Sequence, residues 1–254
     1  HDGHETVRLY WAESDRKTRY VDLDLGEVHI NDFELTSNGT DIFLAGFHTH
    51  KTSDLIKDFR WNYPSDSYHR PISVHSDGIF MLRYNLRKRK VLAKGVYYFD
   101  EIKGKEFNHT SHKDLRTDNL HFFPSGHLVF TGRRANLSQK GTDLLRNIYD
   151  LYLVSFTDKG KLVDTKAAPL VHRSSDLSEN IIGYKTVVQK DRLYLWTNAH
   201  YNTLNELPQL EHLNVHFNYQ GNTRNDLICL EYDYKSGKLL SKGSIGKLKK
   251  STRV

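Results

Sequence analysis

The sequence predicts an all-β protein made of repeated units of four antiparallel strands. Short runs of alternating apolar and polar residues, rich in β-branched and aromatic side chains, recur along the 254 residues. The spacing typical of an amphipathic helix is nearly absent. The same order of runs and turns returns three times after an initial half unit. The alternation predicts the fold class, and the repeat predicts the grouping into units.

Each unit opens with a predicted hairpin of two strands. The three hairpins pair residues 28–35 with 41–47, 120–123 with 127–132, and 184–188 with 192–197. Asn38-Gly39 and Ser125-Gly126 offer the positive φ that tight hairpin turns require, and Lys190-Asp191 lies at the third turn. These positions therefore predict the first and second strands of each unit.

A second hairpin completes each unit after a longer connection. The third strands are predicted at 78–84, 149–156 and 226–232, with turns at 85–89, 157–160 and 233–237. Each fourth strand begins with a lysine followed by a hydrophobic residue, at Lys90, Lys161 and Lys238. The N-terminal part supplies only a third and a fourth strand, at 7–11 and 19–25. The expected count is two strands followed by three sets of four.

Four antiparallel strands per repeat is the construction of a β-propeller blade, because one such sheet cannot bury both faces alone. In its organisation the sequence resembles diverged propellers of the kelch-like and WD-like kind. Its sequence segments DIFLAGF, HLVFTGR and KLLSKG are similar to those of envelope propellers of Bacteroidota-type bacteria. The resemblance covers about residues 26–245 and implies a single β-propeller domain over 1–254.

The expected propeller has a half blade at 7–25 and blades at 28–99, 120–171 and 184–246. About three and a half blades do not close a ring, since propellers have about four to eight blades. We therefore expect the domain to be incomplete as given. If the chain is complete, an open β-array or a sandwich of two sheets is the alternative architecture.

The connections between the second and third strands are long and unlike one another, at 48–77, 133–148 and 198–225. Long loops on a rigid scaffold often carry binding residues. The first and third loops are rich in aromatic and basic side chains, which combine contact area with a polar group. The candidate contacts for a protein partner or a glycan are Trp61, Tyr63, Arg70, Tyr201 and Tyr219. The alternative is that these side chains fold back over the blade edges.

The motifs give no catalytic residue, no metal site and no cofactor. The pairs His48-x-His50, His109-x-x-His112 and His212-x-x-x-His216 could place two imidazoles together, but no carboxylate stands at a diagnostic offset. We therefore expect surface histidines. Loop carboxylates such as Asp54 and Glu206 keep glycoside cleavage open, and the nucleophile motif Gly-x-Ser-x-Gly is absent.

Charge and hydropathy argue against two further classes of protein, those that bind nucleic acid and those with a membrane-spanning helix. The 37 basic and 31 acidic residues give a net charge of +6, which is a mild positive excess. Acidic residues also lie among the basic and aromatic residues of the first loop. No nucleic acid partner is therefore predicted. The basic run 83–90 and the tail 247–253 are expected to be a solvated turn and a frayed end. No apolar run reaches the roughly 18 to 20 residues of a membrane-spanning helix. Cys229 lies in an apolar stretch and predicts a buried thiol.

Together these features predict a non-enzymatic binding or scaffold subunit of a larger assembly, envelope- or secretion-associated, with one or more protein partners. The start at His1 and the resemblance to envelope propellers predict a periplasmic or cell-envelope location, or otherwise secretion. The alternative function is a carbohydrate-active enzyme or a glycan-binding protein of propeller fold, so the question of an enzyme stays open.

Overall fold

The computed structural model describes residues 7–12, 17–50, 75–102, 115–140, 143–174, 184–200 and 225–247. These residues form an all-β fold without a helix, as the alternation predicts. The strands are β1 Val7–Ala12, β2 Thr18–Leu23, β3 Val28–Ser37, β4 Asp41–His50, β5 Gly78–Asn85, β6 Lys90–Tyr98, β7 Leu115–Phe122, β8 His127–Lys140, β9 Asp143–Thr157, β10 Leu162–Ser174, β11 Tyr184–Gln189, β12 Arg192–His200, β13 Asn225–Asp233 and β14 Lys238–Lys247. Among these residues, none forms a helix that could cross a membrane.

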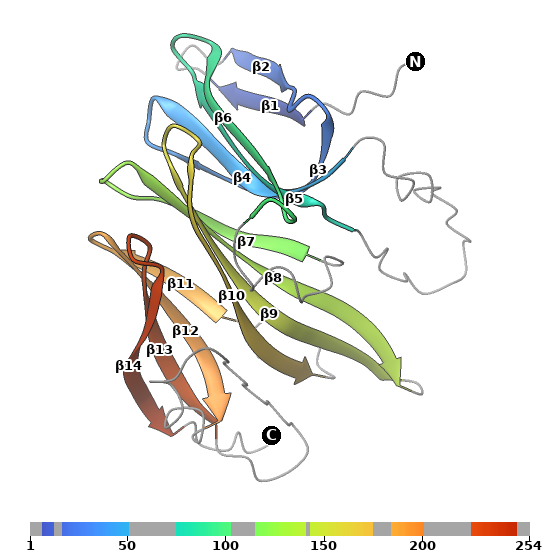
Figure 1. Ribbon diagram of the computed structural model, residues 1–254, viewed down its shortest axis with the longest axis vertical. Coiled ribbons are helices and arrows are strands. Elements are labelled where there is room, and N and C mark those ends of the chain that lie inside the picture. The colour runs from blue at the N-terminus through green and yellow to red at the C-terminus, as the bar shows by residue number, and fades with distance from the viewer. Residues whose placement is uncertain are drawn as a thin grey trace.

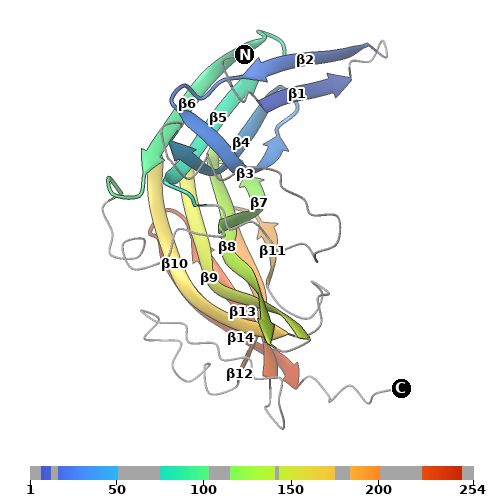
Figure 2. The same cartoon turned by 90° about the vertical axis from the view of Figure 1, so that its right-hand side faces the viewer.

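The strands form one two-stranded sheet and three four-stranded sheets, and all neighbouring strands are antiparallel. β1 pairs with β2, and the larger sheets follow the chain as β3-β4-β5-β6, β7-β8-β9-β10 and β11-β12-β13-β14. Within the described ranges, the predicted count of two strands and three sets of four is therefore confirmed. Figure 1 shows the sheets stacked in chain order, and Figure 2 shows that the stack is curved and that no sheet closes on itself.

The prediction of a loop at 133–148 is wrong. β8 continues to Lys140 and β9 begins at Asp143, and Lys140 pairs with Asp143, so the second unit has a long hairpin in place of this loop. The backbone ladder carries this extension through the polar run 133–140, whose side chains give no clear alternation. In the other two predicted loops the first residues, 48–50 and 198–200, belong to β4 and β12, and residues 51–74 and 201–224 lie outside the described residues.

β4 lies at the centre of the described core and is buried on both faces. Phe43, Ala45 and Phe47 point toward the β7–β10 sheet, whereas Ile42 and Leu44 point toward β1 and β2. This division follows from the alternation of side chains along a strand. The first four-stranded sheet is therefore covered on one face by the next sheet and on the other by the half unit.

Two clusters of buried side chains hold these layers together. The cluster between the first and second four-stranded sheets contains Phe43, Ala45, Phe47, Ile79, Met81, Phe99, Ile102, Leu115, Leu120, Leu128, Phe130, Tyr152, Val154 and Phe156. Within it, Phe47 and Phe130 meet edge to face with ring centroids 5.4 Å apart. The cluster beneath β1 and β2 contains Leu9, Leu23, Leu25, Val28, Ile42, Leu44, Phe80, Leu82 and Tyr84. Burial of apolar surface between successive sheets thus stabilises the stack.

Polar contacts attach the third four-stranded sheet to the second. The hydroxyl of Tyr184 donates to Asp118 Oδ2 at 2.6 Å, and that of Tyr232 donates to Asp164 Oδ2 at 2.8 Å. Because these tyrosines belong to β11 and β13, both the first and the third strand of the last sheet contact its predecessor.

One position in the repeat carries an ion pair whose charges are exchanged between sheets. In the first sheet Asp41 begins β4 and pairs with Arg83 of β5, whereas in the third Arg192 begins β12 and pairs with Glu231 of β13. The strand registers place these residues at equivalent points, since Phe43 opposes Arg83 and Tyr194 opposes Glu231. The exchange indicates that the repeat preserves the pairing geometry while the residue types differ.

Candidate functional site

The two ends of each four-stranded sheet differ in what they carry. At the hairpin end, turns join the first strand to the second and the third to the fourth. At the opposite end, here called the loop end, the second strand finishes and the third begins. In the first sheet the loop end brings together the end of β4, the residues 75–77 before β5, the start of β3 and the end of β6. This corner is the candidate site.

A polar network fixes the base of the first loop. Asn31 lies where the pairing of β3 with β4 shifts by one residue. Its Nδ2 donates to Thr49 Oγ1 at 2.8 Å, to the carbonyl of His75 at 2.9 Å and to Ser76 Oγ at 3.0 Å, and Thr49 Oγ1 also donates to the His75 carbonyl. Thr49 and Ser76 are buried. The β-bulge thus directs one amide side chain to both sides of the loop.

A single carboxylate contacts both residues that flank the loop. The amide of His50 donates to Asp77 Oδ2 at 2.8 Å, and His75 Nε2 lies 3.2 Å from Asp77 Oδ1. The backbone of Asp77 pairs with its neighbours as well, because its amide donates to the His48 carbonyl at 2.8 Å and its carbonyl accepts from Phe99 at 2.9 Å. His50 and His75 are therefore held at fixed positions on the sheet.

His48 is buried beside this network, so the expectation of a surface histidine is wrong at this position. Its Nε2 lies 3.1 Å from the carbonyl of Tyr97, and since a carbonyl only accepts, Nε2 carries the proton. Nδ1 is then the bare nitrogen, and it has no hydrogen-bond partner in the described part of the chain. Burial lowers the pKa of His48 to about 4, against the smaller raising effect of the Tyr97 carbonyl. The imidazole is neutral at pH 7.

Glycine at position 78 makes room for this ring. A Cβ there would lie 2.5 Å from His48 Nε2 and closer still to the Tyr97 carbonyl oxygen. The ring therefore crosses β5 at Gly78 to reach β6, where the Tyr98 ring meets it edge to face at 5.1 Å. A residue with a side chain at this point would displace the imidazole.

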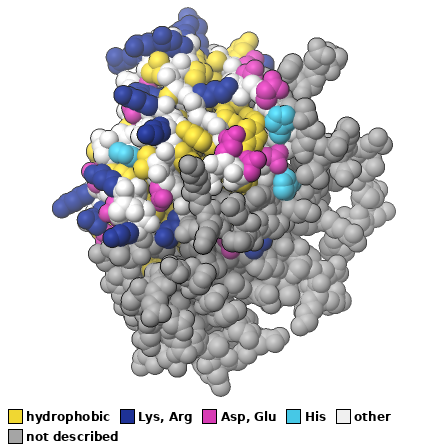
Figure 3. Space-filling model, in the orientation of Figure 1, with side chains coloured by type: hydrophobic (Ala, Val, Ile, Leu, Met, Phe, Trp, Pro, Cys, Tyr) yellow, Lys and Arg dark blue, Asp and Glu magenta, His cyan; other side chains and the backbone are white. Residues whose placement is uncertain are grey.

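Carboxylates surround Tyr98 at the same corner. Burial raises the pKa of Tyr98, and the charges of Glu101, Asp77, Glu27 and Asp100 raise it further. Figure 3 shows His and acidic side chains gathered at the right-hand edge of the coloured surface, whereas most Lys and Arg side chains lie at its top and left. The described residues contain no group of three or more His, Cys, Asp or Glu side chains suited to a metal ion. The corner offers hydrogen-bond donors and acceptors and negative charge.

All five predicted contact residues lie outside the described residues. Trp61, Tyr63 and Arg70 belong to 51–74, and Tyr201 and Tyr219 belong to 201–224. The residues beside both segments lie at the loop end, since β4 ends at His50 and β12 pairs His200 with Asn225. The pairs His109-x-x-His112 and His212-x-x-x-His216 also fall outside the described ranges.

Sequence reasoning missed the residues that fix the loop base. Asn31, Ser76 and Asp77 were assigned no role, because their hydrogen bonds to the far side of the loop base join residues 18 to 45 positions apart and leave no periodic signal. Comparison with protein-family models, with curated proteins and with solved structures gave no match. The function is therefore inferred from the residues of this chain.

Proposed function

We propose that this protein is a rigid binding module whose loop end receives a protein partner within a larger assembly. The observation that carries the proposal is the attachment of His50 and His75, on the two sides of the first loop, to the single carboxylate of Asp77. Asn31 adds a second attachment to the same two sides. Fixing the base of a binding loop before the partner arrives lowers the entropic cost of association.

We also propose that the sheets are the blades of a β-propeller located in the bacterial cell envelope. The serial stacking of four-stranded antiparallel sheets and the exchanged ion pair at equivalent positions support the repeat. A curved stack supports a propeller over two facing sheets, because in a two-sheet sandwich no sheet is covered on both faces by others. The proposed location rests on the resemblance of the three sequence segments to those of envelope propellers.

The contacts that we assign to the partner are Trp61, Tyr63, Arg70, Tyr201 and Tyr219. Aromatic rings and guanidinium groups contribute most of the binding free energy in many protein interfaces. The segments that hold these residues follow the ends of β4 and β12, which lie in the first and third four-stranded sheets. We assign both segments to one partner that spans the loop end of the second sheet between them.

The test compares two double variants with the wild-type chain. Trp61→Ala with Tyr201→Ala removes proposed contacts, whereas Tyr10→Ala with Tyr20→Ala removes two rings that are 58% and 61% exposed on β1 and β2. Proteins captured by each immobilised variant are quantified by mass spectrometry, and the strongest is then purified and titrated. We expect its affinity to fall at least about tenfold for the loop variant only. Equal affinity of the loop variant and the wild type refutes the assignment.

A carbohydrate-active enzyme is the second candidate function. Several carboxylates act on Tyr98, and one of them, Asp77, also contacts the imidazole of His75. Paired carboxylic acids are the groups that most glycoside hydrolases use. Incubation with a panel of polysaccharides, followed by measurement of released reducing ends, separates the two functions. Turnover that is lost in Asp77→Asn but not in Tyr10→Ala would replace the binding proposal by this one.

A further inference from the structure

The turn between the third and fourth strands is basic and exposed in every four-stranded sheet. The first sheet has Arg87, Lys88, Arg89 and Lys90 there, the second has Lys159 and Lys161, and the third has Lys235 and Lys238. All eight side chains are exposed. We call this set the outer-turn row. It lies at the hairpin end, opposite the candidate site described above.

The three turns that hold the outer-turn row carry a net charge equal to that of the whole protein. The turns at 86–90, 157–161 and 233–238 hold eight of the 37 basic residues and two of the 31 acidic residues, which gives +6. The remaining 29 basic and 29 acidic residues of the chain balance. The excess of basic over acidic residues in these turns therefore produces a positive field at one end of the stack. In Figure 3 Lys and Arg side chains gather at the top and left, where Figure 1 draws the β5–β6 and β9–β10 turns.

Contacts between sheets hold the basic turns in line. Gly160 has a φ of +83°, and a Cβ there would lie 3.0 Å from the backbone of Lys94 in β6, so the second turn packs directly on the first sheet. Lys166 of β10 donates from Nζ to the Gly237 carbonyl at 3.5 Å, which places the third turn on the second sheet. Adjacent sheets pack about 10 Å apart, so the row extends over about 20 Å.

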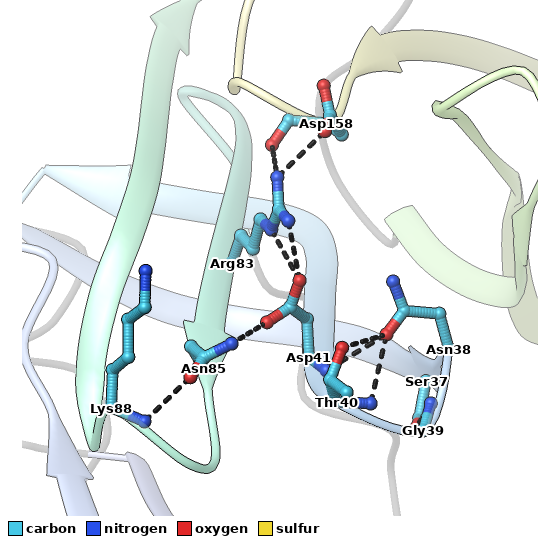
Figure 4. Close-up of polar contacts among 9 residues, drawn as sticks. All are labelled: Ser37, Asn38, Gly39, Thr40, Asp41, Arg83, Asn85, Lys88 and Asp158. Atoms are coloured by element: carbon cyan, nitrogen blue, oxygen red, sulfur yellow. Dashed lines mark hydrogen bonds and ion pairs between the residues drawn. The ribbon is translucent and has the colours of Figure 1, made fainter.

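An ion-pair network fixes the first two turns relative to each other (Figure 4). Arg83 donates from Nε to Asp41 Oδ2 at 2.9 Å and from Nη1 to Asp158 Oδ2 at 2.7 Å, so one guanidinium joins the first sheet to the second turn. Asn85 donates to the other oxygen of Asp41 and accepts from the Lys88 amide at 2.7 Å. The cations of the row are therefore presented on a rigid base.

We infer that the outer-turn row binds a linear acidic polysaccharide. Three groups of two to four cations, spaced about 10 Å apart, match a polymer that carries repeated negative charges better than a single small anion. The rings of Tyr84 and Tyr234, beside the first turn and within the third, are buried, so they offer no surface for stacking the bases of a single-stranded nucleic acid. The exposed apolar residues Val91 and Val163 lie behind the charged tips, an arrangement that disfavours insertion into a membrane.

The test measures binding of polygalacturonate to the full chain by titration calorimetry at several salt concentrations. The variant Lys161→Glu with Lys238→Glu reverses two charges of the row, and Lys161→Gln with Lys238→Gln only removes them. The control, Arg116→Glu with Lys185→Glu, makes the same charge change at exposed positions near the loop-end starts of β7 and β11. Thermal unfolding confirms that each variant is folded.

We expect the Glu variant of the row to lose about ten- to a hundredfold in affinity, the Gln variant to lose less, and the control to bind as the wild type does. Added salt should weaken binding of the wild type. The inference is overturned if polygalacturonate does not bind or if row and control variants lose equally. It is also overturned if duplex DNA, single-stranded DNA or phosphatidylserine vesicles bind more tightly at equal salt. Because the two row variants leave the loop end unchanged, failure here is distinct from failure of the proposed function.

Discussion

Replacing His48 by Gln removes a buried imidazole that must stay neutral in the folded protein. Its pKa is lowered by burial from 6.5 to about 4, whereas in the unfolded chain it is near 6.5. The unfolded chain therefore binds the extra proton between these values, and folding loses stability as the pH falls through this window. The full shift corresponds to about 3 kcal/mol, of which about 2 kcal/mol is reached at pH 5. Gln can keep the hydrogen bond to the Tyr97 carbonyl and does not titrate.

Urea unfolding of the wild type and His48→Gln at pH 7.5 and pH 5 measures this contribution. We expect the difference in unfolding free energy between the two proteins to change by about 2 kcal/mol in favour of the variant at pH 5. The comparison cancels the other titrating groups, since both proteins share them. An unchanged difference between the two pH values would mean that His48 is solvated or charged in the folded state, contrary to the geometry described.

Three further predictions concern the packing of the turns and the loop base. Arg83→Met leaves the carboxylate of Asp41, whose side chain is 3% exposed, without its cation, and urea unfolding should show a loss of about 2–3 kcal/mol; a loss below about 1 kcal/mol contradicts the buried pair. Gly160→Ala and Gly39→Ala both impose a side chain at positive φ, but only position 160 meets another sheet, so its loss should exceed that of Gly39→Ala by about 1–3 kcal/mol; equal losses refute the contact. Asn31→Ala should lower stability by about 1–3 kcal/mol and speed amide exchange at the loop base, and unchanged exchange there would show that the network does not fix it.

The strand order could be predicted from the sequence because each strand that enters the core has one or two apolar faces. The runs at 41–47 and 78–84 are nearly continuous in apolar residues, and they became β4 and β5, which are buried. Lys90 and Lys238 are the first residues of their fourth strands, and Lys161 directly precedes the fourth strand of the second sheet. The grouping into four followed from the turns between these runs.

The extension of β8 and β9 could not be predicted in the same way. Residues 133–140 are mostly polar, and their pairing is made by backbone groups that the side-chain pattern does not report. The loop base was missed for a related reason. The bonds of Asn31 to Thr49 and Ser76 depend on a one-residue shift in the pairing of β3 and β4, which only the folded register reveals.

The stacking of successive sheets is tested most directly by the coupling between Phe47 of β4 and Phe130 of β8. Their rings meet edge to face across the boundary between the first two four-stranded sheets. A double-mutant cycle with Phe47→Leu and Phe130→Leu, measured by urea unfolding, should give a coupling of about 0.5–1.5 kcal/mol. The pair Phe47 and Phe80, which lie in separate clusters on opposite faces of the first sheet, should give about zero. A coupling near zero for Phe47 and Phe130 would show that the two sheets do not pack face to face.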